Sequence, residues 1–421
     1  MPRFNRLAEW LQWQESLHPR SIDLGLDRVA RVAQRMELRQ PGPFTITVAG
    51  TNGKGSSIAM LEAMLLRAGY SVCSYTSPHL LRYNERIRIN GTEVSDTELC
   101  SAFDAVDTRR HQDSLTCFEF GTLAALGIIQ DRAPDISLLE VGLGGRLDAV
   151  NIIDPDIALV TAIGIDHVVW LGNSRAAIAR EKAGIFRSSV PAVSSDPDPV
   201  DSLGEAARKT GARWYGLNEQ YHYVINTKDW NWTGPCTQHD SLPVPVLPGD
   251  YQFDNAAGVL MVLELIRERY PVDRGSIDSG LQEVRLPGRC QFTGGAPETV
   301  LDVAHNPQGA RGLVAVLRNR PVTGNTWVVL GMLEDKDVAG FTEYLAPVAD
   351  HWCLAGLEAE RGLTAAALGA RVSDAINPAV IACFPDVTAA LGHASRAAGT
   401  GDRVVVCGSF HTVAEAMAGT V

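Results

Sequence analysis

The sequence predicts an α/β protein of two domains, a larger amino-terminal domain with a mostly parallel sheet and a smaller, Rossmann-like carboxyl-terminal domain. Short apolar runs rich in β-branched residues alternate with amphipathic stretches, which is the pattern of β–α–β units. Glycine- and proline-rich stretches between residues 286 and 297 interrupt this alternation, and it restarts at Thr299. We therefore expect one domain over residues 1–286 and a second over residues 287–421.

Composition narrows the class of protein. The chain of 421 residues is 45% apolar and has a net charge of −12, which argues against a general nucleic-acid or anionic-membrane surface. Its eight cysteines include no C-x-x-C pair, so we expect reduced thiols and no zinc site or disulfide framework. Residues 4–17 have the spacing of an amphipathic helix rather than a signal peptide, and no apolar run approaches the length of a membrane span. These features favour a cytoplasmic protein.

The stretch 44–57, FTITVAGTNGKGSS, predicts a strand, a phosphate-binding loop and a helix in direct succession. Three glycines let backbone N–H groups surround an oxyanion, the helix amino end adds a positive dipole, and Lys54 supplies a full charge. The loop departs from the common phosphate-loop pattern, because Val48 stands at the first glycine position and Gly55 separates Lys54 from Ser56. The alternative interpretation is a glycine-rich turn with a surface lysine.

Three later strands end in side chains that suit a divalent cation. Ser77 follows strand 71–76, Glu140 lies in the apolar strand 136–141, and His167 follows strand 157–162. Ligands bind at the carboxyl ends of strands in open α/β sheets, and a buried carboxylate is costly unless it is paired or binds metal. The alternatives are that Ser77 only begins a turn and that His167 is a structural histidine.

The other predicted elements complete the alternation. Within residues 21–34 we expect a turn at 23–26 followed by a helix. Further helices are expected at 56–68, 96–111, 118–131, 174–183, 251–269 and 307–318, and strands at 45–48, 190–193, 214–216, 221–225, 299–303, 326–330, 351–354, 379–383 and 403–407. Residues 229–248 are either a β-ribbon or a loop, and residues 82–88 either a solvated ribbon or an anion site. Asn255 either reaches a purine base or caps its helix. Capping and surface ion pairs alone can explain Glu181 and Lys182.

Eight motifs, taken together and in order, resemble one family. They are GTNGKGS at 50–56, SPHL at 77–80, EVGLGGRLDAVN at 140–151, DH at 166–167, REKAGIF at 180–186, LPGR at 286–289, DVAHNP at 302–307 and GSFHTV at 408–413. The chain resembles the bacterial dihydrofolate synthase/folylpolyglutamate synthase family, a branch of the Mur ligase superfamily. The similarity runs nearly from end to end and is weakest over residues 196–248.

The resemblance implies an ATP-dependent ligase. Such an enzyme phosphorylates the carboxylate of 7,8-dihydropteroate, or the γ-carboxylate of a reduced folate, and L-glutamate then attacks the acyl phosphate. The resemblance also implies Mg²⁺, two ions in all, with K⁺ as a further candidate cation and ATP as co-substrate. The expected partners are these small molecules, with no nucleic acid, no membrane and a monomeric chain.

The resemblance also implies roles for individual residues. ATP would be bound by Gly50, Thr51, Asn52, Gly53, Lys54, Gly55, Ser56, Asn255, Arg289 and Asp302. Magnesium would be held by Ser77, Glu140 and His167. Dihydropteroate or folate would be bound by Asp23, Leu24, Gly25, Leu26, Thr116, Cys117, Phe118, Glu119, Leu147, Asp148 and Ala149. Glutamate would be placed by His305 and Ser409, and the catalytic residues would be Lys54, Lys182 as an N6-carboxylysine, and His305.

Three other functions stay open on the sequence. A folylpolyglutamate synthase without dihydropteroate activity would lack the pterin residues, which this chain carries at 23–26, 116–119 and 147–149. Those residues also argue against a Mur-type ligase for another amino acid. A non-catalytic ATP-binding module would have an incomplete metal set, whereas Ser77, Glu140 and His167 are all present.

Overall fold

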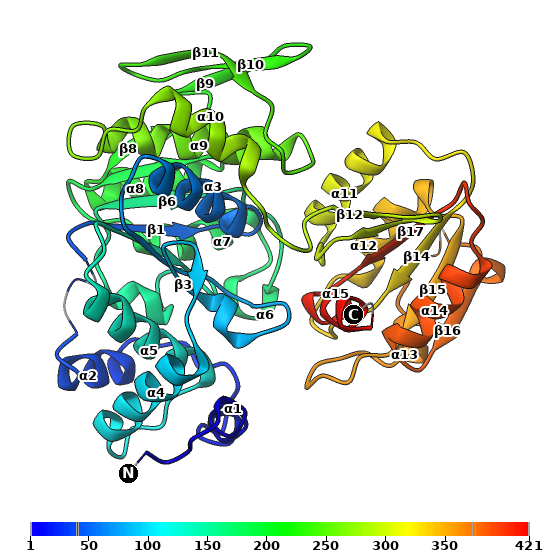
Figure 1. Cartoon of the computed structure of the whole chain (residues 1–421), viewed down its shortest axis with the longest axis horizontal. Helices are drawn as coiled ribbons and strands as arrows, with labels where there is room; N and C mark the ends of the chain where they lie inside the picture. The colour runs from blue at the N-terminus through cyan, green and yellow to red at the C-terminus, as the bar shows by residue number, and fades with distance from the viewer. Residues whose placement is uncertain (1, 39, 41, 373, 375, 420–421) are drawn as a thin grey trace. The chain divides into compact units, whose positions relative to one another are not determined.

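The computed structural model describes residues 2–38, 40, 42–372, 374 and 376–419, which form two compact units (Figure 1). The first unit comprises the chain up to Ile163, together with Asn173–Val246 and Phe253–Val284. The second comprises Gly164–Gly172, Leu247–Gln252 and the chain from Arg285 onward. The sequence predicts that 164–172 and 247–252 belong to the first domain, whereas in the structure both segments group with the second unit.

The first unit is built on an eight-stranded sheet in the order β4-β3-β2-β5-β1-β6-β7-β8. The strands are β1 (Thr45–Ala49), β2 (Val72–Tyr75), β3 (Ile87–Ile89), β4 (Thr92–Glu93), β5 (Ile136–Glu140), β6 (Ile157–Val160), β7 (Pro191–Ser194) and β8 (Arg213–Gly216). All pairs are parallel except those made by β3 and β4 at one edge. The strand β1 is buried along its whole length, as expected for an apolar run covered on both faces.

Helices cover both faces of this sheet. They are α1 (Leu7–Glu15), α2 (Asp27–Arg35), α3 (Lys54–Arg67), α4 (Asp96–Arg110), α5 (Cys117–Arg132), α7 (Arg175–Lys182), α8 (Asp201–Thr210), α9 (Tyr251–Ile266) and α10 (Arg274–Glu283). Helices α1, α2, α4 and α5 share one core, which also includes Tyr75 of β2 and in which the rings of Trp10, Phe103 and Phe120 pack against one another. Helices α3, α9 and α10 lie together in Figure 1, and Gly280 of α10 meets Met64 of α3 closely.

Residues 229–243 form a ribbon rather than a loop, and residues 244–248 follow it without regular structure. Strands β9 (His222–Ile225), β10 (Asp229–Thr233) and β11 (Gln238–Pro243) make a three-stranded antiparallel sheet. Alternate residues Trp230 and Trp232 of β10 are fully buried, and the Trp232 indole N–H donates to Ala257 O of α9 at 3.2 Å. Because alternate residues of a strand point to the same face, both tryptophan rings are buried on one side of this short sheet, and their burial stabilises its packing on the rest of the unit.

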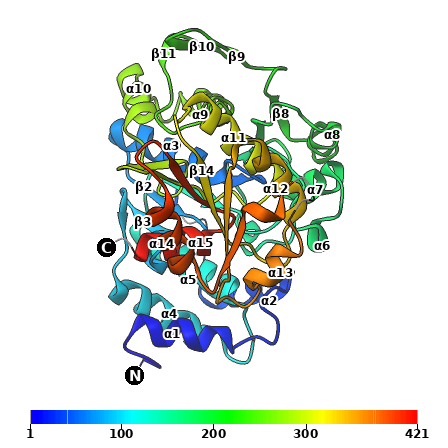
Figure 2. The ribbon, with the colours of Figure 1, turned by 90° about the vertical axis from the view of Figure 1, so that its right-hand side faces the viewer.

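The second unit is a doubly wound α/β sheet, which Figure 2 shows with its helices around it. Its six strands lie in the order β12-β13-β17-β14-β15-β16. The strands are β12 (Gln291–Gly294), β13 (Glu298–Leu301), β14 (Thr326–Leu330), β15 (His351–Ala355), β16 (Ile381–Phe384) and β17 (Arg403–Cys407). The helices are α6 (Val168–Leu171), α11 (Pro307–Asn319), α12 (Val338–Leu345), α13 (Ala365–Gly369), α14 (Val387–Ala397) and α15 (Phe410–Ala418). Only β12, at the edge, pairs antiparallel.

Local differences from the sequence analysis concern short elements. Residues 82–88 are not a solvated ribbon, because they form the 3-10 helix η1 (Tyr83–Arg86) and the start of β3, with Tyr83, Asn84 and Ile87 buried. The helix α10 was not predicted. Within the described residues, no helix combines the length and the apolar character needed to cross a membrane.

Candidate active site

The loop between β1 and α3 is held in one conformation by its neighbours. Gly50 and Gly53 have φ values of 154° and 97°, and a Cβ atom at either would collide with a side chain, Thr161 or Asn255 respectively. The backbone N–H groups of Thr51 and Asn52 donate to Ala162 O at 2.9 and 3.4 Å. The loop therefore follows the end of β6 and leads into the amino end of α3, where the first backbone N–H groups have no partner within the helix.

Lys54 is not a surface lysine, so that alternative is wrong. Helix α3 begins at Lys54, two residues earlier than the helix predicted from 56, and the side chain folds back over the loop. Its Nζ donates to Gly50 O at 3.2 Å and to Thr51 O at 3.4 Å, and it lies 3.9 Å from Oε1 of Glu140. The ammonium group is thus placed between the glycine loop and the end of β5.

Glu140 and Ser77 lie together, as the strand-end argument predicted. Glu140 is the last residue of β5 and only 5% exposed, and its Oε2 accepts a hydrogen bond from Ser77 N at 3.2 Å. The strand β5 lies between β1 and β2, so its end meets the segments that follow both neighbours. One carboxylate, one hydroxyl side chain and the Lys54 ammonium therefore converge at this edge of the sheet.

Lys182 also reaches this edge, which overturns its interpretation as a surface residue. The side chain at the end of α7 is 5% exposed, and its Nζ donates to Gly50 O at 2.7 Å. A Cβ atom at Gly145 would lie 2.9 Å from Lys182 O, so the GLGG turn packs directly on the backbone of α7. Glu181, its neighbour, makes the surface ion pair that was expected, with Arg146 at 3.1 Å.

Asp166 and His167 belong to the second unit and lie in a network there. The Asp166 carboxylate accepts from Lys336 Nζ at 2.7 Å and from Asn306 Nδ2 at 3.1 Å, and it lies 3.2 Å from His305 Nε2. Burial alone would raise the pKa of Asp166, but the His305 hydrogen bond and the Lys336 charge outweigh it and hold that pKa far below its ordinary range.

His167 has the properties of a neutral ligand. Burial and the nearby Lys336 charge lower the pKa of His167 to about 4, so the imidazole is uncharged near neutral pH. Its Nδ1 is buried and has no hydrogen-bond partner among the residues that the structure describes, the Asp335 carboxylate being 3.8 Å away. A neutral imidazole with an unsatisfied nitrogen is the form of histidine that binds metals.

Asp302 and Ser409, two further predicted site residues of the second unit, accept hydrogen bonds from nearby backbone N–H groups. Asp302, just after β13, accepts from Cys290 N at 2.7 Å and from Ala304 N at 2.8 Å, and it is 5% exposed. Ser409 caps α15, since its Oγ accepts from Thr412 N at 3.0 Å. These contacts fix the positions of Asp302 and Ser409 at the carboxyl ends of β13 and β17.

Two more predicted ATP contacts have local partners. The Arg289 guanidinium lies 5.0 Å from the centre of the Phe410 ring. Asn255 is buried in α9 against Gly53 and lies past the first turn, so it supports the loop and is not a helix cap.

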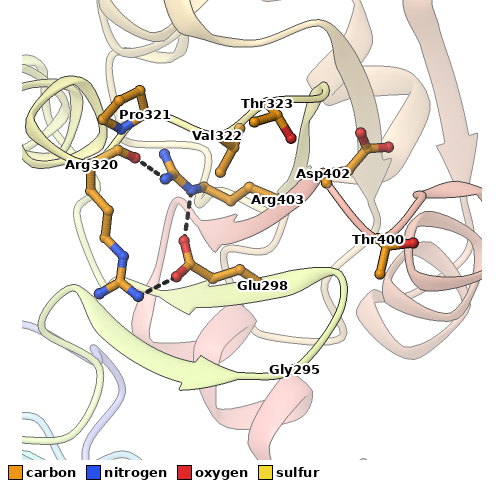
Figure 3. Close-up of a pocket in the computed structure, with 10 residues that line it drawn as sticks. Gly295, Glu298, Arg320, Pro321, Val322, Thr323, Thr400, Asp402 and Arg403 are labelled. Carbon is orange, nitrogen blue, oxygen red and sulfur yellow. Dashed lines mark hydrogen bonds and ion pairs between the residues drawn. The ribbon is translucent and has the colours of Figure 1, made fainter.

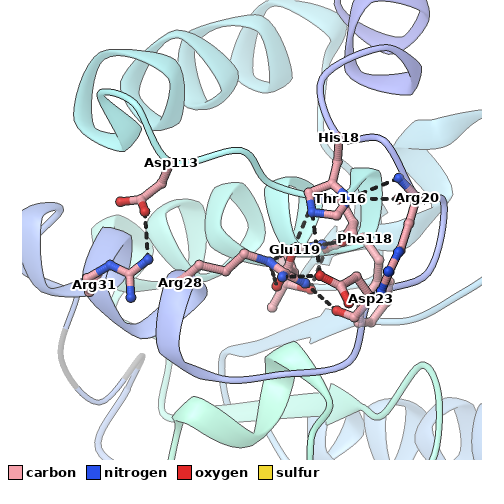
Figure 4. A network of polar contacts seen from close by, with 10 residues as sticks. His18, Arg20, Asp23, Arg28, Arg31, Asp113, Thr116, Phe118 and Glu119 are labelled. Atoms are coloured by element: carbon pink, nitrogen blue, oxygen red, sulfur yellow. Dashed lines mark hydrogen bonds and ion pairs between the residues drawn. The ribbon is translucent and has the colours of Figure 1, made fainter.

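Of the predicted pterin residues, Asp23, Thr116, Phe118 and Glu119 lie together at the amino end of α5 (Figure 4). Thr116 and Glu119 form a capping box, with Thr116 N donating to Glu119 Oε2 at 2.8 Å and Glu119 N donating to Thr116 Oγ1 at 3.2 Å. Arg28 bridges this helix end to Asp23, donating to both oxygens of Glu119 at 2.8 and 2.9 Å and to Asp23 at closer range. Segments 23–26 and 116–119, nearly a hundred residues apart in sequence, therefore meet.

Phe118 joins these residues to the 142–149 turn. Its ring meets Gly142 closely and stacks on Tyr75 with a centroid separation of 6.3 Å. Asp148, 2% exposed, accepts from Leu143 N at 2.8 Å and from Val150 N at 3.0 Å. Burial raises the pKa of Asp148 to about 6, against the effect of those backbone donors. Leu147 and Ala149 flank it on the same turn.

Two predicted ligands of the first unit suit a hard divalent cation, because Ser77 offers a hydroxyl and Glu140 a buried carboxylate. In the second unit, His167 by itself offers a neutral imidazole. Among the described side chains, no group of three or more histidines, cysteines, aspartates or glutamates is clustered closely enough to hold a metal by itself. A bound phosphate would have to complete the coordination, which is common for magnesium.

Sequence reasoning missed several residues that these networks use. Arg28 contacts two predicted site residues, Asp23 and Glu119, and Lys336 contacts the predicted ligand His167 and its neighbour Asp166. Neither Arg28 nor Lys336 lies in a motif that suggested a role. For Lys336 the usable signal was its place after a strand, β14, in the run EDKD. Arg28 gave no signal, because a lysine or arginine in the first turn of an amphipathic helix is ordinary.

A separate pocket lies at the other end of the second sheet (Figure 3). It has a volume of about 240 Å³ and is lined by residues at the amino ends of β13 and β17. Its charged groups satisfy one another, since Glu298 pairs with Arg403 at 3.1 Å and with Arg320 at 2.6 Å. The internal pairing explains these charges without any ligand.

Comparisons with known proteins agree with the geometry. Residues 48–263 match the Mur ligase middle domain and residues 288–410 the Mur ligase, glutamate ligase domain. The chain is 42% identical to the dihydrofolate synthase/folylpolyglutamate synthase of Escherichia coli (strain K12), over 98% of this chain and 94% of that protein.

Solved structures are similar over nearly the whole chain. The structure of E. coli FolC in complex with DHPP and ADP has a TM-score of 0.93 and 41% identity, over 98% of this chain and 97% of that one. The bifunctional enzyme complexed with AMPPNP and Mn ion from Yersinia pestis has a TM-score of 0.91 and 44% identity, over 100% and 99%. The chain belongs to the Mur ligase family, in its dihydrofolate synthase/folylpolyglutamate synthase branch.

Proposed function

We propose that this chain is an ATP-dependent ligase that joins L-glutamate to 7,8-dihydropteroate and to the γ-carboxylate of reduced folates. The observation that carries the proposal is the convergence of Lys54, Glu140, Ser77 and Lys182 on the glycine loop at one edge of the first sheet. The relatives support it, since E. coli FolC binds ADP and DHPP and the second matched domain is described as a glutamate ligase domain.

The proposed reaction has two steps with defined bond changes. A carboxylate oxygen of the pteroate or folate attacks the γ-phosphorus of ATP, and the bond from that phosphorus to the ADP oxygen breaks. The glutamate amine then attacks the acyl carbon, the bond to the phosphate oxygen breaks, and the amine loses a proton. A carboxylate is a poor electrophile until it is phosphorylated, so the first step makes the second possible.

The chain's own groups act mainly through charge and position. The loop N–H groups and Lys54 would hold the phosphate oxygens, whose negative charges must approach the substrate carboxylate. Magnesium would be held by Ser77, Glu140 and His167 and would supply positive charge to those oxygens. Asn255, Arg289 and Asp302 would contact ATP, and His305 and Ser409 would place glutamate, as their positions at strand ends and loop contacts support.

Lys182 would act as a carboxylated lysine. Its amine and CO₂ would form a carbamate, replacing a cation at the loop with an oxygen ligand for a second magnesium. Its burial and its contact with Gly50 O support a role at the phosphates. Uptake of ¹³C-labelled CO₂, followed by carbon NMR of the wild-type chain and of Lys182→Arg, tests this; a carbamate signal should be absent from the variant.

The pterin of 7,8-dihydropteroate would bind between the Asp23 segment, the amino end of α5 and the 142–149 turn. Thr116, Asp23 and Asp148 offer polar groups for the edge of a flat heterocycle, and Phe118 offers an aromatic face. Leu24, Gly25, Leu26, Cys117, Leu147 and Ala149 would complete the walls. We also propose that the chain works as a cytoplasmic monomer on small molecules, with K⁺ as an additional cation; light scattering of the eluted protein tests the monomer.

One assay tests the proposed function. ADP release is measured with ATP, magnesium and L-glutamate, without pterin and then with 7,8-dihydropteroate or with tetrahydrofolate. Stimulation by both, with glutamate incorporated, is the expected result. Stimulation by tetrahydrofolate alone would mean a monofunctional folylpolyglutamate synthase, and stimulation by neither would overturn the proposal.

A further inference from the structure

Arg28 holds two distant segments of the first unit together through one guanidinium group (Figure 4). Its Nε donates to both Glu119 oxygens, at 2.8 and 2.9 Å. Its two terminal nitrogens donate to Asp23, one to the carboxylate and one to the main-chain carbonyl. The planar fork of an arginine is the group that can satisfy a carboxylate on one side and a second segment on the other.

The Glu119 carboxylate is fixed in place, because moving it would break its hydrogen bonds in the capping box of α5. It is 3% exposed, and its Oε2 already accepts from Thr116 N at 2.8 Å and from Thr116 Oγ1 at 2.9 Å. The carboxylate therefore belongs to the capping box of α5 as well as to the ion pair with Arg28. Through Glu119, the Arg28 guanidinium is tied to a fixed point of the helical layer.

The Asp23 segment, in contrast, has no regular structure of its own. Residues 22–25 have no helix or strand and are partly exposed. The other basic side chains near Asp23 are farther away, with His18 Nε2 and Arg20 Nη1 each at 3.5 Å from its carboxylate, and Arg20 is 74% exposed. Arg28 therefore makes the closest contacts that fix both the side chain and the backbone of Asp23.

We infer that Arg28 is a positioning residue that gives the chain its dihydropteroate activity, by holding the Asp23 segment against the amino end of α5. The inference rests on the proposed function, in which those two segments form the pterin wall. Arg28 itself makes no contact with the phosphate loop, so it should not affect the chemical steps. Without the Arg28 guanidinium, the Asp23 segment would no longer be held against the amino end of α5, and 7,8-dihydropteroate would bind more weakly. The residues around the phosphate loop would be unchanged.

Arg31 provides a matched control. It lies one turn later on the same helix, is 53% exposed and makes the same kind of ion pair, with Asp113 Oδ1 at 2.7 Å. Neither Arg31 nor Asp113 touches the Asp23 segment or Glu119. Arg28→Met, Arg28→Lys and Arg31→Met can therefore be compared, the lysine keeping the charge but not the fork.

The test is steady-state ADP release by the full chain, with KM and kcat for 7,8-dihydropteroate and for tetrahydrofolate, well below each variant's melting temperature. Arg28→Met should raise KM for dihydropteroate at least tenfold, leaving kcat and the tetrahydrofolate KM within twofold. Arg28→Lys should fall between Arg28→Met and wild type, and Arg31→Met should match wild type for both substrates.

Results that would overturn the inference can be told apart from a result that would refute the proposed function. Equal KM changes for both substrates, or none, in Arg28→Met would overturn the inference while leaving the proposed function in place. If Arg28→Met does not fold, Arg28→Lys decides: a dihydropteroate KM within twofold of wild type would overturn the inference. A wild-type chain inactive with dihydropteroate would refute that half of the proposed function, and the role of Arg28 with it.

Discussion

Two regions of the first unit are built in different ways and should contribute differently to the reaction. At the carboxyl ends of β1 and β5, the ammonium groups of Lys54 and Lys182 donate to backbone oxygens of the glycine loop. Glu140, at the end of β5, accepts from Ser77 N and lies 3.9 Å from Lys54 Nζ. At the amino end of α5, a loop segment is held by ion pairs among Asp23, Arg28 and Glu119. In the proposed function, the first region would bind the phosphates of ATP, which are needed with either pterin substrate, and the second would bind the pterin of 7,8-dihydropteroate.

The largest expected effect is at the phosphate-loop edge. Glu140→Gln keeps the volume but removes the negative charge of a proposed metal ligand, so kcat should fall roughly 10²- to 10³-fold for both pterin substrates alike. Steady-state ADP release measures this. Glu62→Gln is the matched control, because Glu62 is also buried in the first unit but pairs with Arg88 at 3.3 Å, away from the loop. Near-normal turnover in Glu140→Gln would contradict the assignment.

A second prediction concerns the charge of Asp148. Because burial raises the pKa of Asp148 from 3.8 to about 6, the folded state prefers the neutral carboxyl. That contribution to stability is fully present below pH 3.8 and is lost as the pH rises through 6. The free energy of unfolding of wild type, minus that of Asp148→Asn, should therefore fall by up to about 3 kcal/mol between pH 4 and pH 7.5.

Urea unfolding of both proteins at several pH values measures this difference. Hydrogen bonds that asparagine cannot make change this difference in unfolding free energy by the same amount at every pH. The change of the difference with pH is therefore the result that reports on Asp148. A difference that stays level across this range would mean that Asp148 is not titrating there.

Lys182→Ala should lower kcat roughly 10²-fold for both substrates, because a buried group at the phosphate loop is removed. Acetate or formate should restore part of that activity by occupying the place of the carbamate, and ADP release with increasing acetate measures it. Lys182→Arg, which keeps a cation that cannot be carboxylated, should stay inactive. Full activity in Lys182→Ala would show that no carbamate is needed.

Asp23→Ala should have the smallest effect and the most selective one. We expect KM for 7,8-dihydropteroate to rise roughly tenfold, because about one charged hydrogen bond is lost from the proposed dihydropteroate site. The KM for tetrahydrofolate should change little. Asp113→Ala, which breaks the neighbouring ion pairs with Arg31 and Arg35, is the control. Equal losses with the two substrates would mean that both use Asp23.

The sequence predicted the first region better than the second, for a physical reason. A carboxylate or hydroxyl at the end of an apolar strand must lie at the carboxyl edge of a parallel sheet, so Ser77 and Glu140 could be placed together without knowing the strand order. Their neighbour Lys182 could not be, because its helix has the charge pattern of a surface helix and only the GLGG turn brings it to the loop.

Contacts between distant segments escaped prediction for the same reason. The pairing of Arg28 with Glu119 spans 91 residues and depends on how α2 packs on α5, which periodicity does not specify. Likewise Lys336 meets Asp166 across 170 residues. The family resemblance named Asp23 and Glu119, but not the arginine that joins them.

The most direct test of the difference between the two regions is to measure kcat/KM for 7,8-dihydropteroate and for tetrahydrofolate in wild type, Glu140→Gln and Asp23→Ala under identical conditions. The quantity to compare is the ratio of the dihydropteroate value to the tetrahydrofolate value in each protein. We predict an unchanged ratio in Glu140→Gln, despite its lower rates, and a roughly tenfold lower ratio in Asp23→Ala. A ratio that shifts equally in both variants, or in neither, would contradict the division between a shared phosphate-loop edge and a substrate-specific pterin wall.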